Sequence, residues 1–247
     1  MELCLIGIGT GNPDHITAQA VAALNAADLI LIPRKGPDKS DLAEIRHLIL
    51  SRVLARPVPV ADFDMPQRGT SGGYASDVAD WHDAIAAEWR SAIAAHGGPK
   101  TRVALMVWGD PMLYDSTLRI AAGLNAATVK VVPGITSVQA LCAAHAIALN
   151  EVAEPVLITT GRQLRDKGWP ASAPDTMVVL LDGECSFQTL APDGISIWWA
   201  AYVGMSEEIL YSGRVATIGA EILQARNAAR ERHGWIMDIY LLRRTTQ

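Results

Sequence analysis

The residues Trp108-Gly109-Asp110-Pro111 follow directly on Val103 to Val107, an apolar run that is typical of a buried strand. Gly, Asp and Pro are frequent turn residues, so a surface turn or a helix cap accounts for this segment. A ligand site accounts for it equally well, because glycine lets a backbone approach a ligand closely and a carboxylate accepts from amines and hydroxyls. Both interpretations remain open from this segment alone.

A second strand-like run, Leu3 to Ile8, leads into the glycine-rich segment Gly7-Ile8-Gly9-Thr10-Gly11. A dinucleotide fingerprint requires G-x-G-x-x-G and an acid after the second strand. Here Asn12 stands where the third glycine should be, and the second strand leads to Pro33-Arg34-Lys35 without an acid. A nicotinamide-dependent oxidoreductase is therefore disfavoured and is kept as an alternative from another class of enzyme.

The segment Val132-Pro133-Gly134-Ile135-Thr136-Ser137 also joins a strand-like run to a predicted helix. Free N–H groups at the start of a helix, with two hydroxyls beside them, could hold a carboxylate, although capping of the helix explains the segment as well. Basic residues follow several strand-like runs, which would suit a substrate with many carboxylates. They are Arg34, Lys35, Lys39, Arg119, Arg162 and Arg165.

Strand-like runs and amphipathic helices alternate in the first half of the chain, which predicts a mostly parallel α/β sheet. In such a sheet ligands collect at the carboxyl ends of the strands, where the three segments above lie. The segment Arg56 to Gly73, rich in Pro and Gly, is interpreted as a long irregular loop. The predicted strands cover residues 3–8, 29–32, 103–107 and 128–132, and the predicted helices cover residues 17–24, 40–54, 78–93, 117–125 and 136–146.

The second half of the chain has more strand-like runs and one clear helix, at residues 216–232, which predicts a second lobe with a mixed sheet. The apolar run Ile195 to Met205 could serve an interface between subunits or only the core. The predicted division is an N-terminal α/β domain of residues 1–133 and a C-terminal α/β domain of residues 134–247. The strand-like runs of the second half cover residues 156–160, 177–181, 195–203, 209–212 and 235–242.

The composition limits the possible functions further. Half of the 247 residues are apolar, enough for a substantial core, and the formal net charge of −5 disfavours a nucleic-acid partner. No apolar segment is long enough to span a membrane and the N-terminus carries no basic leader, so a cytoplasmic protein without membrane contact is expected. Cys4, Cys142 and Cys185 lack metal-ligand spacing, which predicts buried thiols and no metal site.

Together these segments resemble the tetrapyrrole methylase family, whose members methylate porphyrin-like rings with S-adenosylmethionine. The family's marks are a glycine-rich first loop followed by D-P-x-x-x-T, a G-D-P after a strand, and a P-G-[IT]-[ST]-[SA] turn. This chain supplies the first mark between Gly7 and Thr17, with Asn12 in place of the acid, the second at Gly109-Asp110-Pro111, and the third at Pro133 to Ser137. The resemblance implies a two-lobed fold with the cofactor bound in the cleft between the lobes, and a homodimer.

The resemblance also implies which residues bind S-adenosylmethionine, or S-adenosylhomocysteine after methyl transfer. In the first lobe these would be Thr10, Gly109, Asp110 and Leu113. The amino-acid end of the cofactor would contact Thr136 and Ser137. The adenosine part would be enclosed by Leu181, by Tyr202 or Ala201, and by Met237 or Asp238.

Further segments, distributed over essentially the whole chain, resemble one member of the family in particular. That member acts in aerobic cobalamin synthesis, where it methylates C1 of precorrin-5 and releases acetate to give precorrin-6A. The resemblance therefore implies a small tetrapyrrole substrate, with another precorrin methylase or a non-catalytic binding module as alternatives. The segments are Trp108 to Arg119, Thr159-Thr160-Gly161-Arg162, and Gly234 to Asp238 with Tyr240 to Arg243.

Release of acetate would need a general base for water and a donor to the developing oxyanion. Asp115 and Tyr114 are the catalytic candidates, since both follow the G-D-P segment directly. Arg162 is a candidate donor or an anchor for a substrate carboxylate. Capping of the next helix through Thr117 would explain Asp115 equally well. Methyl transfer itself needs no nucleophile from the protein, because positioning of the ring carbon behind the methyl group carries much of the rate.

Overall fold

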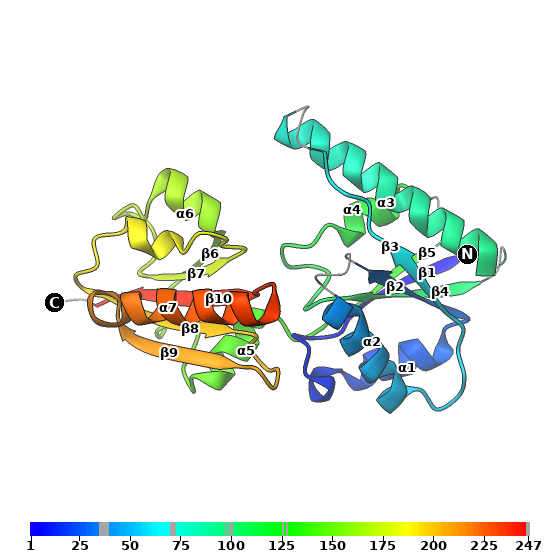
Figure 1. Cartoon of the computed structure of the whole chain (residues 1–247), viewed down its shortest axis with the longest axis horizontal. Coiled ribbons are helices and arrows are strands. Elements are labelled where there is room, and N and C mark those ends of the chain that lie inside the picture. Colours follow the sequence, from blue (N-terminus) through cyan, green and yellow to red (C-terminus); the bar gives the residue numbers. More distant parts are fainter. Residues whose placement is uncertain are drawn as a thin grey trace. The chain divides into compact units, whose positions relative to one another are not determined.

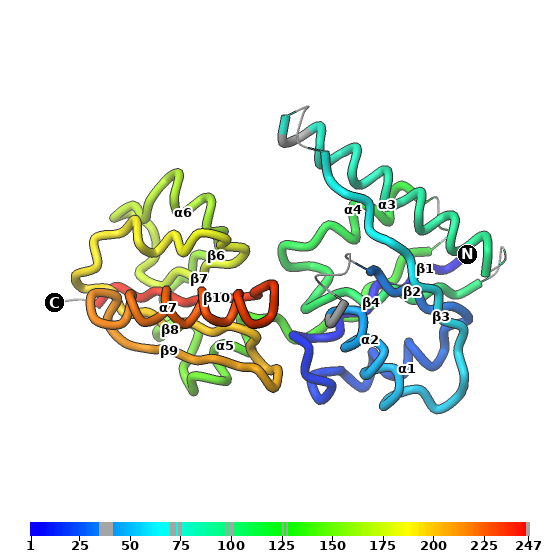
Figure 2. The backbone as a smooth tube through the Cα atoms, in the orientation of Figure 1, coloured from blue at the N-terminus to red at the C-terminus, as the bar shows by residue number. Residues whose placement is uncertain are grey.

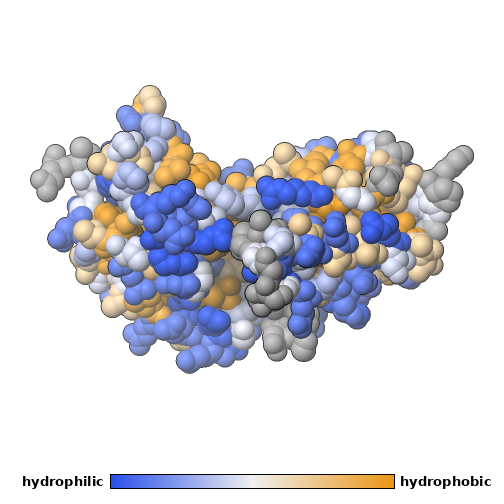
Figure 3. Space-filling model, turned by 90° about the horizontal axis from the view of Figure 1, so that it is seen from above, coloured by the Kyte–Doolittle hydropathy of each residue, from blue (hydrophilic) through white to orange (hydrophobic). Residues whose placement is uncertain are grey.

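The chain folds into two compact α/β units, Met1–Thr136 and Ser137–Gln247. A computed structural model describes residues 1–34, 40–69, 73–96, 98, 101–124, 126 and 128–245, without the side chains of residues 40, 41, 74 and 75. Figures 1 and 2 show the elements of each unit. On the face seen in Figure 3, hydrophilic and hydrophobic residues are interspersed in both units.

The first unit is built on a five-stranded sheet in which every pairing is parallel. Its strand order is β3-β2-β4-β1-β5, so β1 lies in the sheet between β4 and β5. The strands are β1 (Glu2–Gly7), β2 (Leu29–Arg34), β3 (Val60–Asp64), β4 (Arg102–Val107) and β5 (Thr128–Val132). The helices are α1 (Ala18–Ala26), α2 (Ser40–Val53), α3 (Tyr74–His96) and α4 (Thr117–Ala122).

Apolar side chains cover both faces of this sheet, as expected for parallel strands that alternate their side chains between two layers of helices. One core cluster joins Leu3 and Leu5 to residues of α3 and α4 such as Trp89 and Ile120. The other joins Ile6 to residues of α1 and α2 such as Leu24. In Figure 1, α3 and α4 accordingly lie on one side of the strands and α1 and α2 on the other. The two layers hold the strand ends in fixed positions.

The second unit contains a mixed five-stranded sheet of order β6-β7-β10-β8-β9. The β6–β7 pairing is parallel, whereas β10 runs antiparallel to both β7 and β8, and β9 is antiparallel to β8. The strands are β6 (Val156–Thr160), β7 (Thr176–Leu180), β8 (Ile195–Ala201), β9 (Ile209–Arg214) and β10 (Asp238–Arg244). The helices are α5 (Ser137–Ala144), α6 (Gly161–Lys167) and α7 (Val215–His233), with a short 3₁₀ turn η3 (Ser186–Thr189).

The fold class predicted from the sequence is confirmed, and some local predictions are wrong. The predicted loop Arg56 to Gly73 contains the edge strand β3, and the short helix α6 was not foreseen. Only Cys185 is buried, while Cys4 and Cys142 are half-buried. The basic residues Lys35 and Lys39 lie outside the described residues.

The apolar run that the sequence left open between an interface and the core belongs to the core. Its first part, Ile195–Ala201, forms β8, which is paired on both sides, and Ile197, Trp199 and Ala200 have no exposed surface. Among the helices that the structure describes, none combines the length and apolar character needed to cross a membrane.

Candidate functional site

Three loops meet at the carboxyl edge of the first sheet, because β4, β1 and β5 are neighbouring parallel strands. Their backbones are in close contact through glycines. A Cβ atom added to Gly7 would lie 2.5 Å from the nitrogen of Gly134 and 2.8 Å from the oxygen of Gly109. The loops after β1 and β4 are also joined by two hydrogen bonds between Gly9 and Gly109. All three sequence motifs are therefore brought together at one edge, as the strand-end argument predicted.

Asp110 holds two of these loops together. One carboxylate oxygen accepts from the backbone N–H of Met112, at 2.7 Å, and the other accepts from the N–H of Gly134, at 2.8 Å. The residue is 9% exposed. Since both oxygens are engaged by the backbone, Asp110 ties the loop after β4 to the loop after β5. This carboxylate thus has a structural reason to stand at the end of a core strand.

Gly109 leaves room for a ligand next to the backbone. Its φ of 67° lies in the left-handed region, and a Cβ added to it would meet no atom within 4 Å. Leu113, predicted to line the cofactor site, is half-buried, and its N–H donates to the oxygen of Asp110. Thr10 is 4% exposed, and its hydroxyl lies 3.2 Å from Nδ1 of His15. The backbone at Gly109 therefore has open space beside it, whereas the hydroxyl of Thr10 is already engaged.

Asp115 caps the start of α4: its Oδ1 accepts from the N–H of Thr117 at 2.6 Å. Oδ2 has no hydrogen bond with the residues that the structure describes. Tyr114, directly before it, is 47% exposed and has a left-handed φ of 49°. The capping alternative considered from the sequence is therefore observed, and it leaves one carboxylate oxygen available for another role.

A buried arginine that the sequence did not single out lies behind this loop. Arg46 of α2 is 5% exposed and donates to the backbone oxygens of Met106, at 3.2 Å, and Leu42, at 2.7 Å. Its guanidinium carbon lies 5.5 Å from the ring centre of Trp108. Burial lowers the pKa of Arg46 to about 10, and the charge of Asp115 opposes that change. Arg46 thus stays charged at neutral pH and fixes the end of β4.

Thr136 and Ser137 lie where the third motif passes into α5, whose first residue is Ser137. Both residues are half-buried. The first N–H groups of an α-helix have no partner within the helix, which makes this position suitable for a carboxylate.

In the second unit, the residues predicted to enclose adenosine gather at one edge of the sheet. Leu181 follows β7 and Tyr202 follows β8, while Met237 precedes β10, which runs in the opposite direction. The N–H of Tyr202 donates to the oxygen of Met237 at 2.9 Å. Leu181 is 68% exposed. Tyr202 is buried, its hydroxyl donates to the oxygen of Trp235, and its backbone oxygen accepts from the N–H of Met205 at 2.9 Å.

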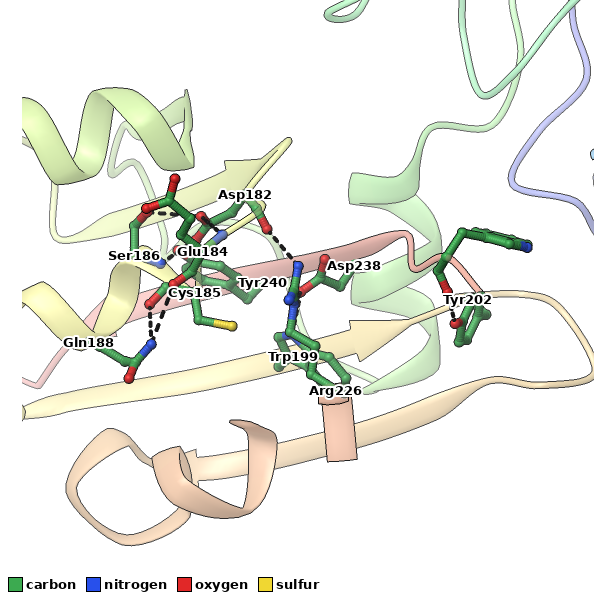
Figure 4. Close-up of polar contacts among 11 residues, drawn as sticks. Asp182, Glu184, Cys185, Ser186, Gln188, Trp199, Tyr202, Arg226, Asp238 and Tyr240 are labelled. Carbon is green, nitrogen blue, oxygen red and sulfur yellow. Dashed lines mark hydrogen bonds and ion pairs between the residues drawn. The ribbon is translucent and has the colours of Figure 1, made fainter. Parts of the chain in front are cut away.

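Beneath this edge lies a buried polar network, shown in Figure 4. Arg226 of α7 donates from Nε to Oδ2 of Asp238, at 2.9 Å, and from Nη2 to the backbone oxygen of Asp182, at 3.2 Å. Trp199 also donates to Asp238, at 3.1 Å. The hydroxyl of Tyr240 donates to Oδ2 of Asp182 at 2.6 Å. Burial raises the pKa of Asp238, which Arg226 counteracts, and burial together with Asp182 raises that of Tyr240.

The helix that carries Arg162 starts against the same network. A Cβ added to Gly161, the first residue of α6, would lie 2.3 Å from the carboxylate carbon of Asp182. Only glycine allows this close packing. Arg162 itself is exposed on α6, in the second unit, whereas Tyr114 and Asp115 belong to the first. The described residues contain no group of three or more His, Cys, Asp or Glu side chains that could hold a metal ion.

The parallel and mixed sheets, with three glycine-containing loops at one strand edge, are the architecture of a family of methyltransferases. Residues 2–219 match the family model of the Tetrapyrrole (Corrin/Porphyrin) Methylases, and the chain belongs to this family. The precorrin-6A synthase [deacetylating] of Sinorhizobium sp is 48% identical over 250 residues, which cover 98% of this chain and 95% of that relative. The precorrin-2 C(20)-methyltransferase of Sinorhizobium sp is 32% identical over 140 residues, 54% of each protein.

Solved structures agree with this assignment. A cobalamin synthesis related protein (CobF) from Corynebacterium diphtheriae has a TM-score of 0.86 and 37% identity, with 100% of both chains covered. The uroporphyrin-III C-methyltransferase of Thermus thermophilus, solved with S-adenosylhomocysteine, has a TM-score of 0.58 and 18% identity and covers 98% of this chain and 92% of its own. At that identity the second likeness supports the fold alone.

Proposed function

We propose that the chain catalyses the reaction named for its 48% identical relative: methylation of C1 of precorrin-5 with release of acetate, giving precorrin-6A. The observation that carries this proposal is that the likeness extends over nearly the full length of both proteins. The likeness to the precorrin-2 methyltransferase is lower and covers about half of each chain. The reaction therefore belongs to cobalamin biosynthesis, and the methyl donor is S-adenosylmethionine.

Both units are proposed to contribute to cofactor binding. The first contributes the open backbone at Gly109, together with Leu113 and Thr136. The second contributes the start of α5 at Ser137, the exposed side chain of Leu181, and the segments at Tyr202 and Met237. When bound, S-adenosylmethionine supplies the methyl group. The protein then needs to orient the ring carbon behind that group and to exclude water, which requires rigid loops rather than a nucleophile.

Asp115 is proposed to accept the proton of the water that attacks the acetyl carbonyl. The water oxygen bonds to that carbon, the bond to C1 breaks with its electron pair left on the ring, and acetate departs. Oδ2 of Asp115 would take the proton, since Oδ1 caps α4. Tyr114 and Arg162 are the proposed donors to the oxyanion or to substrate carboxylates.

The decisive experiment for the reaction is incubation of the purified protein with precorrin-5 and methyl-labelled S-adenosylmethionine. One acetate should be released for each methyl group transferred to the ring. Methyl transfer without acetate would instead indicate another precorrin methylase. Binding of NADH but not of S-adenosylhomocysteine in calorimetry would refute the proposal altogether.

Asp115→Asn separates the two possible roles of this residue. The amide oxygen of Asn can accept the N–H of Thr117 as the carboxylate does, so the helix cap is retained while the base is lost. The variant should bind S-adenosylhomocysteine normally but release acetate about 10²-fold more slowly, or slower still. Asp115→Ala, which loses the cap as well, is the comparison. Wild-type rates of methyl transfer and acetate release in Asp115→Asn would remove Asp115 as the base.

We further propose that the protein acts in the cytoplasm as a homodimer. The family resemblance supports the dimer, and the absence of metal-ligand or paired cysteine spacing supports a reducing compartment. Light scattering of the purified protein would measure the mass of the assembly, for which a value of one 26.5 kDa chain would contradict the dimer.

A further inference from the structure

Two residues at the edge of the second sheet that carries Leu181, Tyr202 and Met237 have an unfavourable backbone conformation. Leu181 and Tyr202 have φ values of 52° and 50°, in the left-handed region that non-glycine residues avoid. Leu181 also exposes most of its apolar side chain. Such a conformation persists only when the surrounding structure fixes it.

The guanidinium of Arg226 links the two segments that flank Leu181 and Met237 at this edge. It binds the oxygen of Asp182, the residue after Leu181, and the carboxylate of Asp238, the residue after Met237. A single side chain on α7 thus joins the two backbone segments that flank the exposed edge. The carboxylate of Asp182 is held in turn by the N–H groups of Glu184 and Ser186 and by two hydroxyls.

Stability alone is a poor explanation for this arrangement. The side chains of Arg226 and Asp238 are 7% and 6% exposed, and the desolvation of such a pair offsets much of its attraction. Apolar residues of similar size would stabilise a core equally well. They could not hold a backbone oxygen and a carboxylate in fixed relative positions, which is what Arg226 does.

We propose that Arg226 is a positioning residue for S-adenosylmethionine: it aligns the Leu181-Asp182 and Met237-Asp238 segments so that they receive the adenosine part of the cofactor. This inference rests on the proposed function, since it assumes that this edge binds adenosine. Tyr240 and Trp199 assist by fixing the two carboxylates that the network contains.

The test compares Arg226→Met with Arg226→Lys and with Arg230→Met, an exposed arginine one turn further along α7. Calorimetry would measure binding of S-adenosylhomocysteine and of 5′-methylthioadenosine, which lacks the amino-acid end. Arg226→Met should weaken both ligands by a similar factor, about tenfold. Arg226→Lys should recover part of that loss, and Arg230→Met should bind as the wild type does.

A purely structural role would lower the unfolding temperature of Arg226→Met without changing either dissociation constant, and that result would overturn the inference. A loss confined to S-adenosylhomocysteine would also overturn it, because the amino-acid end would then be the part affected. If Arg226→Met does not fold, Tyr240→Phe decides the question. It keeps the ring and removes the bond to Asp182, and it should weaken both ligands about threefold. Unchanged affinities would refute the inference.

Failure of the wild-type protein to bind S-adenosylhomocysteine would count against the proposed function. Equal affinity of the wild type and Arg226→Met would count only against the positioning role.

Discussion

Substitution of Gly134 by alanine should disrupt the carboxyl edge of the first sheet more than alanine at any other glycine of that edge. The Cβ would lie 2.1 Å from the oxygen of Gly109 and 2.8 Å from backbone atoms of Gly7, whereas ordinary contact begins at 3.4 Å. Gly134 has no left-handed φ, so alanine is not excluded by its own backbone conformation. The effect is therefore purely steric, and both obstructing groups are backbone atoms that cannot rotate away.

The size of the effect follows from what must move. The turn at Gly134 has to shift by more than an ångström, which breaks the 2.8 Å hydrogen bond to Asp110. Loss of a buried hydrogen bond to a charged group costs about 1.5–3 kcal/mol, and forced repacking adds about 1–3 kcal/mol. The unfolding free energy of the first unit should therefore fall by about 2.5–6 kcal/mol. A displacement of this size should also weaken binding of S-adenosylhomocysteine, by about tenfold for every 1.4 kcal/mol of interaction energy lost.

Gly69→Ala is the matched control in the same unit, because its Cβ would have no atom closer than 3.8 Å and its φ is also unrestricted. This control isolates the effect of Gly→Ala on the entropy of the unfolded chain. That effect alone raises the unfolding free energy by about 0.4–1 kcal/mol. Urea unfolding followed by circular dichroism, amide hydrogen exchange at Gly134 and calorimetry with S-adenosylhomocysteine would measure the three effects. If Gly134→Ala matches Gly69→Ala in both stability and affinity, the close packing of the three loops does not govern the site.

Two further predictions concern buried groups. Arg46→Met should lower the unfolding free energy by about 1–3 kcal/mol in urea, because the oxygen of Met106 loses its donor, whereas Arg52→Met on the exposed side of α2 should change it by less than about 0.5 kcal/mol. Equal effects of the two substitutions would contradict the role assigned to Arg46. Burial raises the pKa of Cys185 from 9.0 to about 11, so the unfolded chain releases this proton first. The contribution to stability is complete below pH 9 and falls by about 1.4 kcal/mol per unit as the pH rises from there to 11. Between pH 9 and 11 the unfolding free energy should decline less steeply for Cys185→Ala than for the wild type. Parallel declines would refute the raised pKa of Cys185.

The strand-end motifs were predictable because topology alone brings them together. Alternating strands and helices imply parallel strands, and the carboxyl ends of parallel strands share one edge. The segments at Gly9, Gly109 and Gly134 therefore had to lie at the same edge once β1, β4 and β5 were recognised, whereas the adjacency of these three strands is known only from the structure. What could not be predicted is the use of Asp110, because its two hydrogen-bond donors are fixed only by the folded turn.

The missed elements are those with too few inward side chains to create a pattern. β3 has five residues, of which Ala61 and Phe63 are buried, and prolines stand on both sides of it. α6 has seven residues and buries only Gly161 and Leu164. Periodicity needs a longer segment than these to be recognised.

The buried network could not be found from the sequence either, because Arg226 and Asp182 are 44 positions apart. The one local signal was an arginine at a position of α7 where the helical spacing of Ile222 and Ala229 predicts an apolar residue. A charged residue on the apolar face of a helix is a reason to look for a buried partner.

Backbone strain gives an independent argument about which predicted residues contact a ligand. Six non-glycine residues of the described chain have positive φ, and Tyr114, Leu181 and Tyr202 are three of them. The left-handed backbone conformation of each such residue lowers the folding stability by about 1–2 kcal/mol, and burial of the side chain can offset this loss. That explanation suffices for Tyr202, whose buried ring and hydroxyl are fully engaged. It fails for Leu181, whose side chain is 68% exposed, so a ligand that covers this side chain would supply the missing burial.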